Sequence, residues 1–409
     1  MSKIKPPRIE FEVGIGAYKS KTLGIGGRIK EIPEDFIVEE ITLEGRILEA
    51  DLNFDSNATN SDKICDDAEM EYLHFTLQKR NWDTLRAIRE ISKRLKISRK
   101  RFGFAGTKDK RAVTTQRVSV WRKSIHDLEK IRITDIVLRD FKYRNERINL
   151  GDLWGNRFTI RIRNINLEHD EIVDRISRII NELDGKIPNF FGPQRFGTTR
   201  PITHLVGKEI LKGNFERAVM LYIAEVFDEE SRESRDARAI LKENMDFKSA
   251  LRKFPKYLGY EKAMLNFLVR NSNDFIGALR RLPKRLRMMF IHAYQSYIFN
   301  KSLSRYIIDG IFVEKLPLVG YETEIDEITS EILEEEGISR EHFRVNRMPE
   351  LSSRGSYRDC FVDFKNFKLI SIENDKLNEG KLSVVIQFSL PRGSYATILI
   401  RELTKNRYW

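Results

Sequence analysis

Alternating apolar and polar residues predict β-strands in two separated parts of the chain. Neighbouring side chains of a strand point to opposite faces of its sheet, so a period of two marks a strand with one buried face. In the segment that begins at Arg157, Phe158 should therefore face inward, whereas Arg161 and Arg163 should face outward. By the same pattern we expect strands over residues 71–79, 102–106, 115–121, 135–143, 157–163 and 382–390.

Apolar residues spaced three and four positions apart predict amphipathic helices elsewhere. One of them covers 82–95 and begins after Asp83, a residue type that favours the N-cap. From about Leu205 to Leu351 helical patterns dominate, and we interpret the acidic run 331–336 within this stretch as a solvated face. Further helices are expected over 171–183, 237–243, 261–269 and 286–307, and from about Ser394 onward.

Strand-rich segments at both ends of the sequence enclose the helical stretch. The simplest architecture is an α+β chain in which one domain is discontinuous and a mainly helical domain is inserted into it. We expect the first part of the discontinuous domain at 1–204, the insertion at 205–351 and the second part at 352–409, with approximate borders. Residues 40–67 are polar and predict a long loop.

The chain of 409 residues carries a net charge of +12, because 73 lysines and arginines outnumber 61 aspartates and glutamates. Such a charge favours a polyanionic partner. Nucleic acid is the commonest one, and an anionic membrane surface is the competitor. The sequence contains no run of about 18 apolar residues and no signal-peptide pattern. We therefore expect a cytoplasmic protein with no membrane partner.

The sequence offers no recognisable site for a metal or a cofactor. Its two cysteines, Cys65 and Cys360, form no CxxC pair, and its six histidines lack the close spacing of zinc ligands. The glycines near Gly14 and Gly24 do not form a phosphate-binding loop and are interpreted as turns. The glycine-rich donor loop of a methyltransferase is missing as well. We expect neither metal nor cofactor.

A short charged turn at Asp109 is the first candidate for chemistry. It follows an apolar segment that ends at Gly106, and its sequence neighbours Lys108, Lys110 and Arg111 are cations. Nearby cations favour the ionised form of a carboxylate even under a bound substrate. An ionised, immobilised carboxylate can act as a nucleophile on carbon. A charged triplet is more often an exposed turn, however, so the pattern alone leaves both interpretations open.

Five segments of the chain form a specific set of motifs. The segment around Asp109 reads GFAGTKDKRAVTTQ. Before it, KEIPEDFIVEE begins at Lys30, and after it GNRF begins at Gly155 and NFFGPQRFG at Asn189. The last segment, LPRGSYAT, begins at Leu390 and is soon followed by REL. These motifs cover most of the chain, and together they resemble the TruD family of pseudouridine synthases, most of all its archaeal branch.

The resemblance implies the pseudouridine synthase fold, which is a mixed, largely antiparallel sheet flanked by helices, with the helical TRUD domain as the insertion. It assigns Asp109 as the nucleophile and Lys30 as the cation that stabilises its carboxylate. A flipped-out base needs an aromatic face to stack on. The residues that the resemblance places against the substrate are Phe36, Asn189, Phe191 and Tyr395 around the base, with Gln194, Arg195 and Lys108 nearby.

The implied reaction is the isomerisation of uridine to pseudouridine in tRNA, at position 13 near the D-stem, and it requires no cofactor or metal. Attack at uracil C6 and attack at ribose C1′ both remain open. Phe191 stands where related synthases have a tyrosine, so Tyr395, Asp109 or a water is left to deprotonate C5. A non-catalytic RNA-binding or RNA-chaperone protein on the same fold is the alternative function. We expect a monomer.

Overall fold

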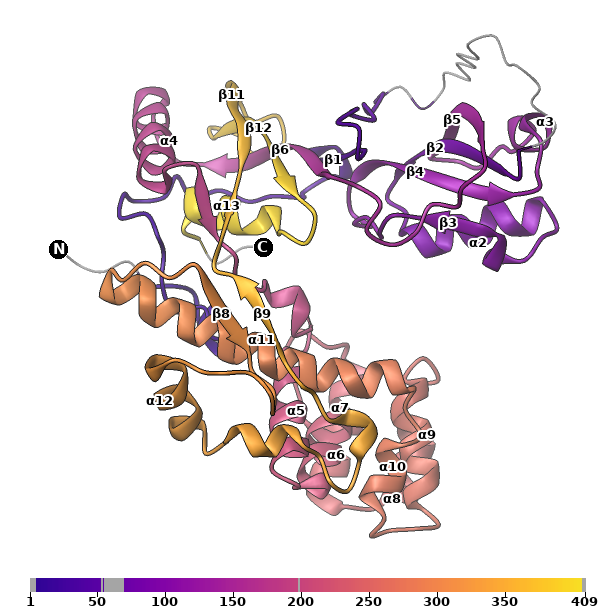
Figure 1. Cartoon of the computed structure of the whole chain (residues 1–409), viewed down its shortest axis with the longest axis vertical. Coiled ribbons are helices and arrows are strands. Elements are labelled where there is room, and N and C mark those ends of the chain that lie inside the picture. The colour runs from indigo at the N-terminus through magenta and orange to yellow at the C-terminus, as the bar shows by residue number, and fades with distance from the viewer. Residues whose placement is uncertain (1–4, 53, 55–69, 198, 407–409) are drawn as a thin grey trace. The chain divides into compact units, whose positions relative to one another are not determined.

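The computed structural model describes residues 5–52, 54, 70–197 and 199–406, and its contacts divide the chain into two compact units. Unit 1 consists of Met1–Lys21 and Pro188–Phe361, and unit 2 consists of Thr22–Ile187 and Val362–Trp409 (Figure 1). The range 205–351 that was predicted as an insertion lies within unit 1. A compact unit does not define the borders of an insertion, so those borders stay a prediction.

Unit 2 is built on one mixed sheet. Its strands are β1 (Phe36–Ile41), β2 (Tyr72–Arg80), β3 (Phe102–Phe104), β4 (Val113–Trp121), β5 (Ile136–Arg144), β6 (Gly155–Ile165), β11 (Lys365–Asn374) and β12 (Leu382–Pro391). The order is β11-β12-β6-β1-β4-β2-β5, and β3 pairs with β4. The pair β1 and β4 is parallel, and the other strand pairs described in this sheet are antiparallel. The predicted α+β class with a mixed, largely antiparallel sheet is confirmed.

Helices cover this sheet because their apolar stripes match its buried side chains. Helix α2 (Thr84–Arg94) begins after Asp83, whose side chain accepts a hydrogen bond from the Arg86 amide, as predicted for an N-cap. Its Ala87, Ile88 and Ile91 join one hydrophobic core with residues of β2 and β4. The remaining helices of unit 2 are α3 (Ile125–Glu129), α4 (His169–Leu183) and α13 (Ala396–Thr404).

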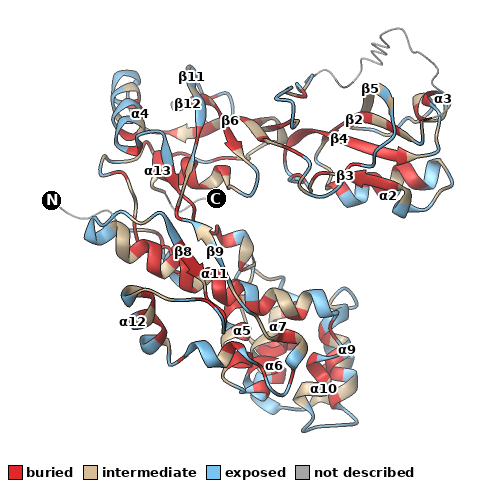
Figure 2. Ribbon diagram, viewed as in Figure 1, coloured by how far each residue is buried: buried red, intermediate tan, exposed pale blue. Residues whose placement is uncertain are grey.

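Unit 1 is mainly helical and is organised around one long helix, α11 (Lys284–Asp309), which ends at Gly310 in the left-handed conformation. The other helices are α1 (Arg8–Glu12), α5 (Thr203–Leu211), α6 (Phe215–Ala224), α7 (Arg232–Asn244), α8 (Phe247–Lys253), α9 (Gly259–Leu268), α10 (Phe275–Leu279) and α12 (Glu327–Glu336). A hairpin of β8 (Lys315–Leu318) and β9 (Ser356–Asp359) accompanies them. Buried residues gather on α5, α6 and α11, which form one core (Figure 2).

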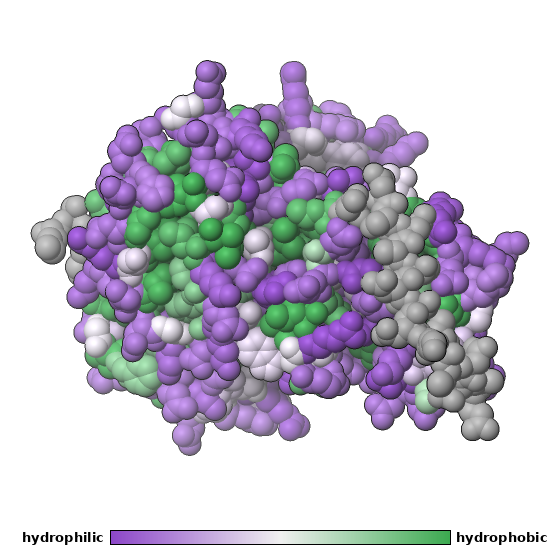
Figure 3. Space-filling view, turned by 90° about the horizontal axis from the view of Figure 1, so that it is seen from above, coloured by the Kyte–Doolittle hydropathy of each residue, from purple (hydrophilic) through white to green (hydrophobic). Residues whose placement is uncertain are grey.

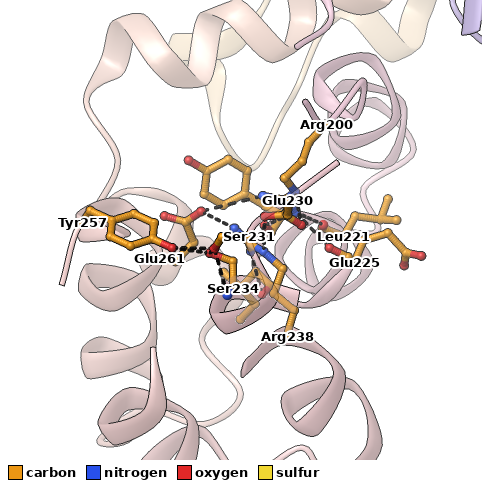
Figure 4. Close-up of polar contacts among 11 residues, drawn as sticks. Arg200, Leu221, Glu225, Glu230, Ser231, Ser234, Arg238, Tyr257 and Glu261 are labelled. Carbon is orange, nitrogen blue, oxygen red and sulfur yellow. Dashed lines mark hydrogen bonds and ion pairs between the residues drawn. The ribbon is translucent and has the colours of Figure 1, made fainter. Parts of the chain in front are cut away.

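A charged network is buried beside this core (Figure 4). The guanidinium of Arg238, whose side chain is 1% exposed, lies 2.9 Å from the carboxylate of Glu230 and 2.8 Å from that of Glu261. Arg200 contacts the same two carboxylates at 3.3 Å and 3.7 Å. Arg238 also donates to the carbonyl of Ile223 at 2.9 Å. The network therefore connects α7 with α9 through charges that offset one another, and α7 with α6 through a backbone carbonyl.

Most elements that the sequence predicted are confirmed with borders shifted by a few residues. The chain crosses between the units after Lys21 and again within the short strands β7 (Lys186–Pro188) and β10 (Phe361–Asp363). Of the predicted loop 40–67, residue 53 and residues 55–67, with Cys65 among them, lie outside the described residues. Single turns of 3-10 helix occur at Pro33–Asp35, Arg99–Arg101, Pro193–Arg195, Arg340–Phe343 and Pro349–Leu351.

One prediction about a charged side chain is wrong, and a second fails at one residue. Arg163 was expected to face outward but is 7% exposed, because Asp35 and Asp375 bind its guanidinium at 2.7 Å and 2.8 Å. In the acidic run at the end of α12, Glu331, Glu334 and Glu335 are exposed as predicted, whereas Glu336 is half-buried. Glu336 lies 2.6 Å from the ammonium of Lys208 and accepts a hydrogen bond from Tyr297 at 3.1 Å. In both cases oppositely charged partners from distant parts of the sequence make burial tolerable.

The surface is mostly polar, and apolar patches lie between the polar side chains in the view of Figure 3. Exposed large apolar residues such as Phe11, Leu150 and Phe312 are spread along the sequence. In the described part of the chain, no helix has both the length and the apolar character that crossing a membrane requires.

Candidate active site

The loop between β3 and β4 presents the carboxylate of Asp109, and Lys30 lies beside it. The Lys30 ammonium is 3.1 Å from Asp109 Oδ2, and the Asp109 side chain is 53% exposed. The same ammonium lies 3.9 Å from the ring centroid of Phe36. Lys30 adopts a left-handed backbone with φ of 61°, which is unusual for a residue with a side chain. The structure thus brings together Lys30, Phe36 and Asp109, which are separated by up to 79 positions in sequence.

A buried lysine, Lys79, holds the backbone of the Asp109 loop. The ammonium of Lys79 donates to the carbonyls of Trp82 at 2.6 Å and Asp109 at 3.0 Å, and its residue is 0% exposed. Burial lowers the pKa of Lys79 to about 8, and the negative charge of Asp109 opposes this effect. The loop carrying the candidate nucleophile is therefore fixed through its own backbone.

Further hydrogen bonds brace the loop against β4 and the first turn of α2. The Lys108 amide donates to the Thr84 hydroxyl at 2.9 Å, and that hydroxyl donates to the Gln116 side chain at 2.8 Å. Gln116 in turn donates to the carbonyl of Gly106 at 2.9 Å. In β3, a Cβ added at Gly103 would lie 2.3 Å from the carbonyl oxygen of Ile148, so glycine is required for this close approach.

The side chain of Lys108 points into the protein. Its ammonium lies 2.9 Å from Glu40 Oε2 and donates to Asn156 Oδ1 at 2.6 Å, and the side chain is 5% exposed. Asn156 belongs to the GNRF segment and Glu40 to the segment that begins at Lys30, so two family motifs meet here. These contacts fix Lys108, the residue next to Asp109, and the predicted contact of Lys108 with substrate stays a prediction.

The turn that carries Lys30 and Phe36 is anchored separately. Asp35 accepts a hydrogen bond from the Ile32 amide at 3.0 Å and binds Arg163 of β6. Phe36 is 1% exposed and packs edge-on against Phe158, with ring centroids 6.1 Å apart. The predicted role of Phe36 at the base would therefore use only a small accessible part of the ring, unless the surrounding residues move.

A second group of predicted residues belongs to unit 1. The side-chain amide of Asn189 donates to the carbonyl of Asp359 at 2.8 Å and accepts from the guanidinium of Arg358. Phe191 is 8% exposed, and the Arg358 guanidinium lies 4.1 Å from its ring centroid. The backbone of Phe191 forms two hydrogen bonds of 2.9 Å with the side chain of Asn300. The amide edge of Asn189 and one face of Phe191 are thus both engaged by Arg358.

The remaining predicted residues are less constrained. Gln194 is exposed, and Arg195 is half-buried with its Nε 3.5 Å from the Ser296 hydroxyl. Tyr395 is half-buried at the N-terminal end of α13, in unit 2 together with Asp109. Since the predicted residues belong to two units, the structure describes two groups of them, each within its own unit.

Sequence reasoning missed three residues of these groups, namely Lys79, Arg163 and Arg358. Lys79 did leave a signal: it shares the parity of Leu73, Phe75 and Leu77, which are all 0% exposed. A lysine on the apolar face of a strand indicates a buried cation with a specific partner. Arg358 left no such signal, because its partners Asn189 and Phe191 are far away in sequence.

Comparison with known proteins identifies the family. The family model described as tRNA pseudouridine synthase D (TruD) matches residues 12–316 and 309–403. The chain belongs to the TruD family. Relatives within it include a Methanosarcina mazei protein named "Probable tRNA pseudouridine synthase D", which is 38% identical, with 98% of each chain covered. A Methanocaldococcus jannaschii protein, "Probable tRNA pseudouridine synthase D 1", is 41% identical, with 93% of this chain and 96% of that protein covered.

A solved TruD structure shares the fold. The crystal structure of the Methanosarcina mazei TruD protein matches with a TM-score of 0.82 and 39% sequence identity, and 98% of each chain is covered. The predicted TruD fold is confirmed by this match, and the predicted archaeal resemblance is confirmed by relatives from archaea.

Proposed function

We propose that this TruD chain isomerises uridine to pseudouridine in tRNA. The observation that carries the proposal is the contact of 3.1 Å between Lys30 and Asp109, on a loop whose backbone the buried Lys79 holds. A cation beside the carboxylate favours its ionised, nucleophilic form. The surrounding hydrogen bonds keep the carboxylate in place before substrate arrives, which lowers the reorganisation that the reaction requires.

In the proposed reaction, Asp109 attacks either uracil C6 or ribose C1′ of a flipped-out uridine. The bond between C1′ and N1 breaks, uracil turns, and a new bond forms between C1′ and C5. The bond between Asp109 and C6 or C1′ also breaks, which returns the free carboxylate. The C5 proton is lost and N1 carries a proton in the product, so atoms and charge balance without an oxidant or a donor. The base that removes the C5 proton is Tyr395, Asp109 or a water.

The base would be received by Phe36, Asn189, Phe191 and Tyr395, with Gln194, Arg195 and Lys108 beside them. Arg358 limits how this can happen, because its guanidinium lies 4.1 Å from the centroid of the Phe191 ring. An incoming uracil would have to displace that guanidinium or stack on the opposite face of the ring. Stacking on an aromatic side chain contributes about 1–3 kcal/mol per base, which is comparable with the roughly 0.5–2 kcal/mol of a cation–π contact.

The finer assignments belong to the same proposal. We place the reacting uridine at position 13, in the D-stem region, and the protein in the cytoplasm as a monomer. The range 205–351 is proposed as the inserted domain, with 1–204 and 352–409 as the two parts of the catalytic domain. The charge of +12 supports a tRNA partner, because lysines and arginines attract a polyanion over a long range.

The test is pseudouridine formation on unmodified tRNA transcripts by the wild type and by Asp109→Asn, which keeps the shape of the side chain and removes its charge. The matched control is Asp170→Asn, the same change at a fully exposed carboxylate of α4. We expect conversion of a D-stem uridine by the wild type and the control, and none by Asp109→Asn with unchanged tRNA binding. Conversion that survives in Asp109→Asn would overturn the role of Asp109.

Absence of conversion by the wild type on every tRNA, with tight binding retained, would instead support the alternative function. The chain would then be a non-catalytic RNA-binding or RNA-chaperone protein on the same fold. Mapping the converted nucleotide by sequencing separately tests position 13, since the class of reaction and its position can fail independently.

A further inference from the structure

A concave pocket of about 640 Å³ lies in unit 2, away from the Asp109 carboxylate. It is formed by the ends of β1 and β5, by the middle of β4 and by the turns at residues 42–46 and 145–148. Five cations line it: Arg46, Arg117, Lys142, Arg144 and Arg147. Neither its shape nor its charge is used by the reaction proposed above.

Arg117 is the cation set deepest in this pocket. Its guanidinium donates to the carbonyl of Asp140 at 3.0 Å, while the carboxylate of Asp140 is bound by Arg139 at 3.1 Å. Burial lowers the pKa of Arg117, and the positive charges of Arg46 and Arg144 act in the same direction, whereas the negative charges of Asp140 and Glu40 oppose them. Among the described residues, no carboxylate lies within ion-pair distance of Arg117, Arg46 or Arg144.

The acids that line the pocket offset this group of cations only in part. Glu40 is bound by the ammonium of Lys108 at 2.9 Å, and Asp152 accepts from the Asn149 amide at 2.7 Å within its own turn. Glu44 and Glu146 are both exposed. The hydrogen bond from Thr42 lowers the pKa of Glu44, and the charges of Arg117 and Arg144 lower it further. A half-buried arginine without a carboxylate partner is costly by itself, and an anion entering the pocket would offset that cost.

We propose that this pocket binds one backbone phosphate of the tRNA, at a nucleotide near the reacting uridine in space. Guanidinium groups suit phosphate because their planar N–H donors match its oxygens, and three of them converge here from β4, β5 and the turn after β1. A phosphate contact carries no base information and so would fix the position of the RNA. This inference rests on the proposed function, because that function supplies the RNA.

The side chain of Glu40 links the pocket to the Asp109 loop. The Oε1 atom of Glu40 accepts from the Arg117 amide at 2.9 Å, and its Oε2 atom lies 2.9 Å from the ammonium of Lys108. One carboxylate therefore joins the floor of the pocket to the residue next to Asp109. Along β4, Val113 and Arg117 are roughly 13 Å apart at the usual rise of a strand. Since the Asp109 loop leads directly into Val113, we expect one bound tRNA to reach both the loop and the pocket.

The experiment compares full-length wild type, Arg117→Gln and Arg144→Gln. Arg178→Gln on α4 is the control, because its side chain is 66% exposed and pairs locally with Asp174. Binding of an unmodified tRNA transcript is measured over a series of salt concentrations. We expect Arg117→Gln to weaken binding about tenfold and to reduce the slope of affinity against salt by about one phosphate. The Arg144 side chain is exposed, so the Arg144→Gln variant should fold even if Arg117→Gln does not.

Phosphate-ethylation interference then identifies the ligand. Ethylating one backbone phosphate should weaken binding to the wild type and to Arg178→Gln, and the same modification should have no effect on Arg117→Gln or Arg144→Gln. An identical interference pattern in all four proteins would overturn the proposal. A second result would also overturn it: inorganic phosphate binds at the pocket, but the ethylation pattern of the tRNA is the same for all four proteins. The ligand of the pocket would then be a free phosphate compound and not the RNA backbone.

The two proposals can fail separately. Interference is read from binding, so it tests the phosphate site even if no pseudouridine forms. Pseudouridine formation at saturating tRNA tests the reaction even if Arg117 has no RNA contact. Where both hold, Arg117→Gln should raise KM for tRNA by a larger factor than it lowers kcat.

Discussion

Lys79 gives a prediction that can be worked out from its surroundings. Replacing it by methionine keeps an unbranched side chain of similar length in a fully buried position but removes the ammonium. At neutral pH two effects oppose one another. The carbonyls of Trp82 and Asp109 lose their donor, which costs about 1–3 kcal/mol each, while a buried charge is removed, which is favourable. The sign of the change in the free energy of unfolding is therefore not diagnostic. The dependence of this change on pH is diagnostic.

The dependence follows from the pKa of Lys79, which burial lowers to about 8 from an ordinary value near 10.5. Below pH 8 the lysine is protonated in the folded and unfolded states, and it contributes no pH dependence. Between these two pKa values the unfolded chain binds a proton that the folded chain has lost, so the free energy of unfolding rises with pH. From neutral pH to about pH 9.5, Lys79 should add about 2 kcal/mol to the wild type and nothing to the variant.

Tryptophan fluorescence during urea unfolding is the appropriate assay. The four tryptophans, Trp82, Trp121, Trp154 and Trp409, all belong to unit 2, so the signal reports the unit that contains Lys79. The free energies of wild type and Lys79→Met are compared at each pH, since other titrating groups then cancel. A difference between the two proteins that stays constant over this range would refute the reasoning, because Lys79 would then keep its proton throughout.

Three further changes have definite expected outcomes. Lys30→Met should lower kcat by at least about tenfold, because the substitution removes the positive charge beside Asp109. The stability of unit 2 should not change, because the Lys30 side chain is not part of the core, and an unchanged kcat would contradict the prediction. Arg163→Met should destabilise unit 2 by about 3–5 kcal/mol in the fluorescence assay, because two buried carboxylates lose their cation; a change under 1 kcal/mol would speak against that burial. Arg238→Met should lower the stability of unit 1 by a similar amount, about 3 kcal/mol, measured by helical circular dichroism, and wild-type stability in this variant would argue against the network of Figure 4.

The sequence predicted the elements of the fold well because their patterns are local. The strand β4 and the N-cap of α2 were predicted from residues within a few positions of one another, and both are confirmed, although β4 is buried on both faces. Arg163 was misplaced because strand alternation assigns a face but does not reveal partners. Its partners are 128 and 212 positions away. The prediction for the acidic run failed at Glu336 for the same reason, since Lys208 is 128 positions from Glu336.

The site was predicted through resemblance more than through physics. Chemistry alone left Asp109 undecided between a nucleophile and an exposed turn. The contact with Lys30 joins two segments that no local pattern relates, and it needed the folded chain to appear. Lys79 was accessible in principle from its parity in β2. The strand over 115–121 was predicted, but the cations that gather around Arg117 could be recognised only in three dimensions.

The position of β12 in the sheet has a consequence for how the protein is made. Strand β6 pairs with β1 on one side and with β12 on the other, and Phe158 of β6 meets Phe388 of β12. During synthesis from the N-terminus, β6 therefore keeps an open, hydrogen-bonding edge while all of 188–361 is being added. Unit 1 can fold in that interval, whereas the sheet must wait for the last strands. We expect the nascent chain to be most prone to aggregation at this stage, and to depend most on chaperones then.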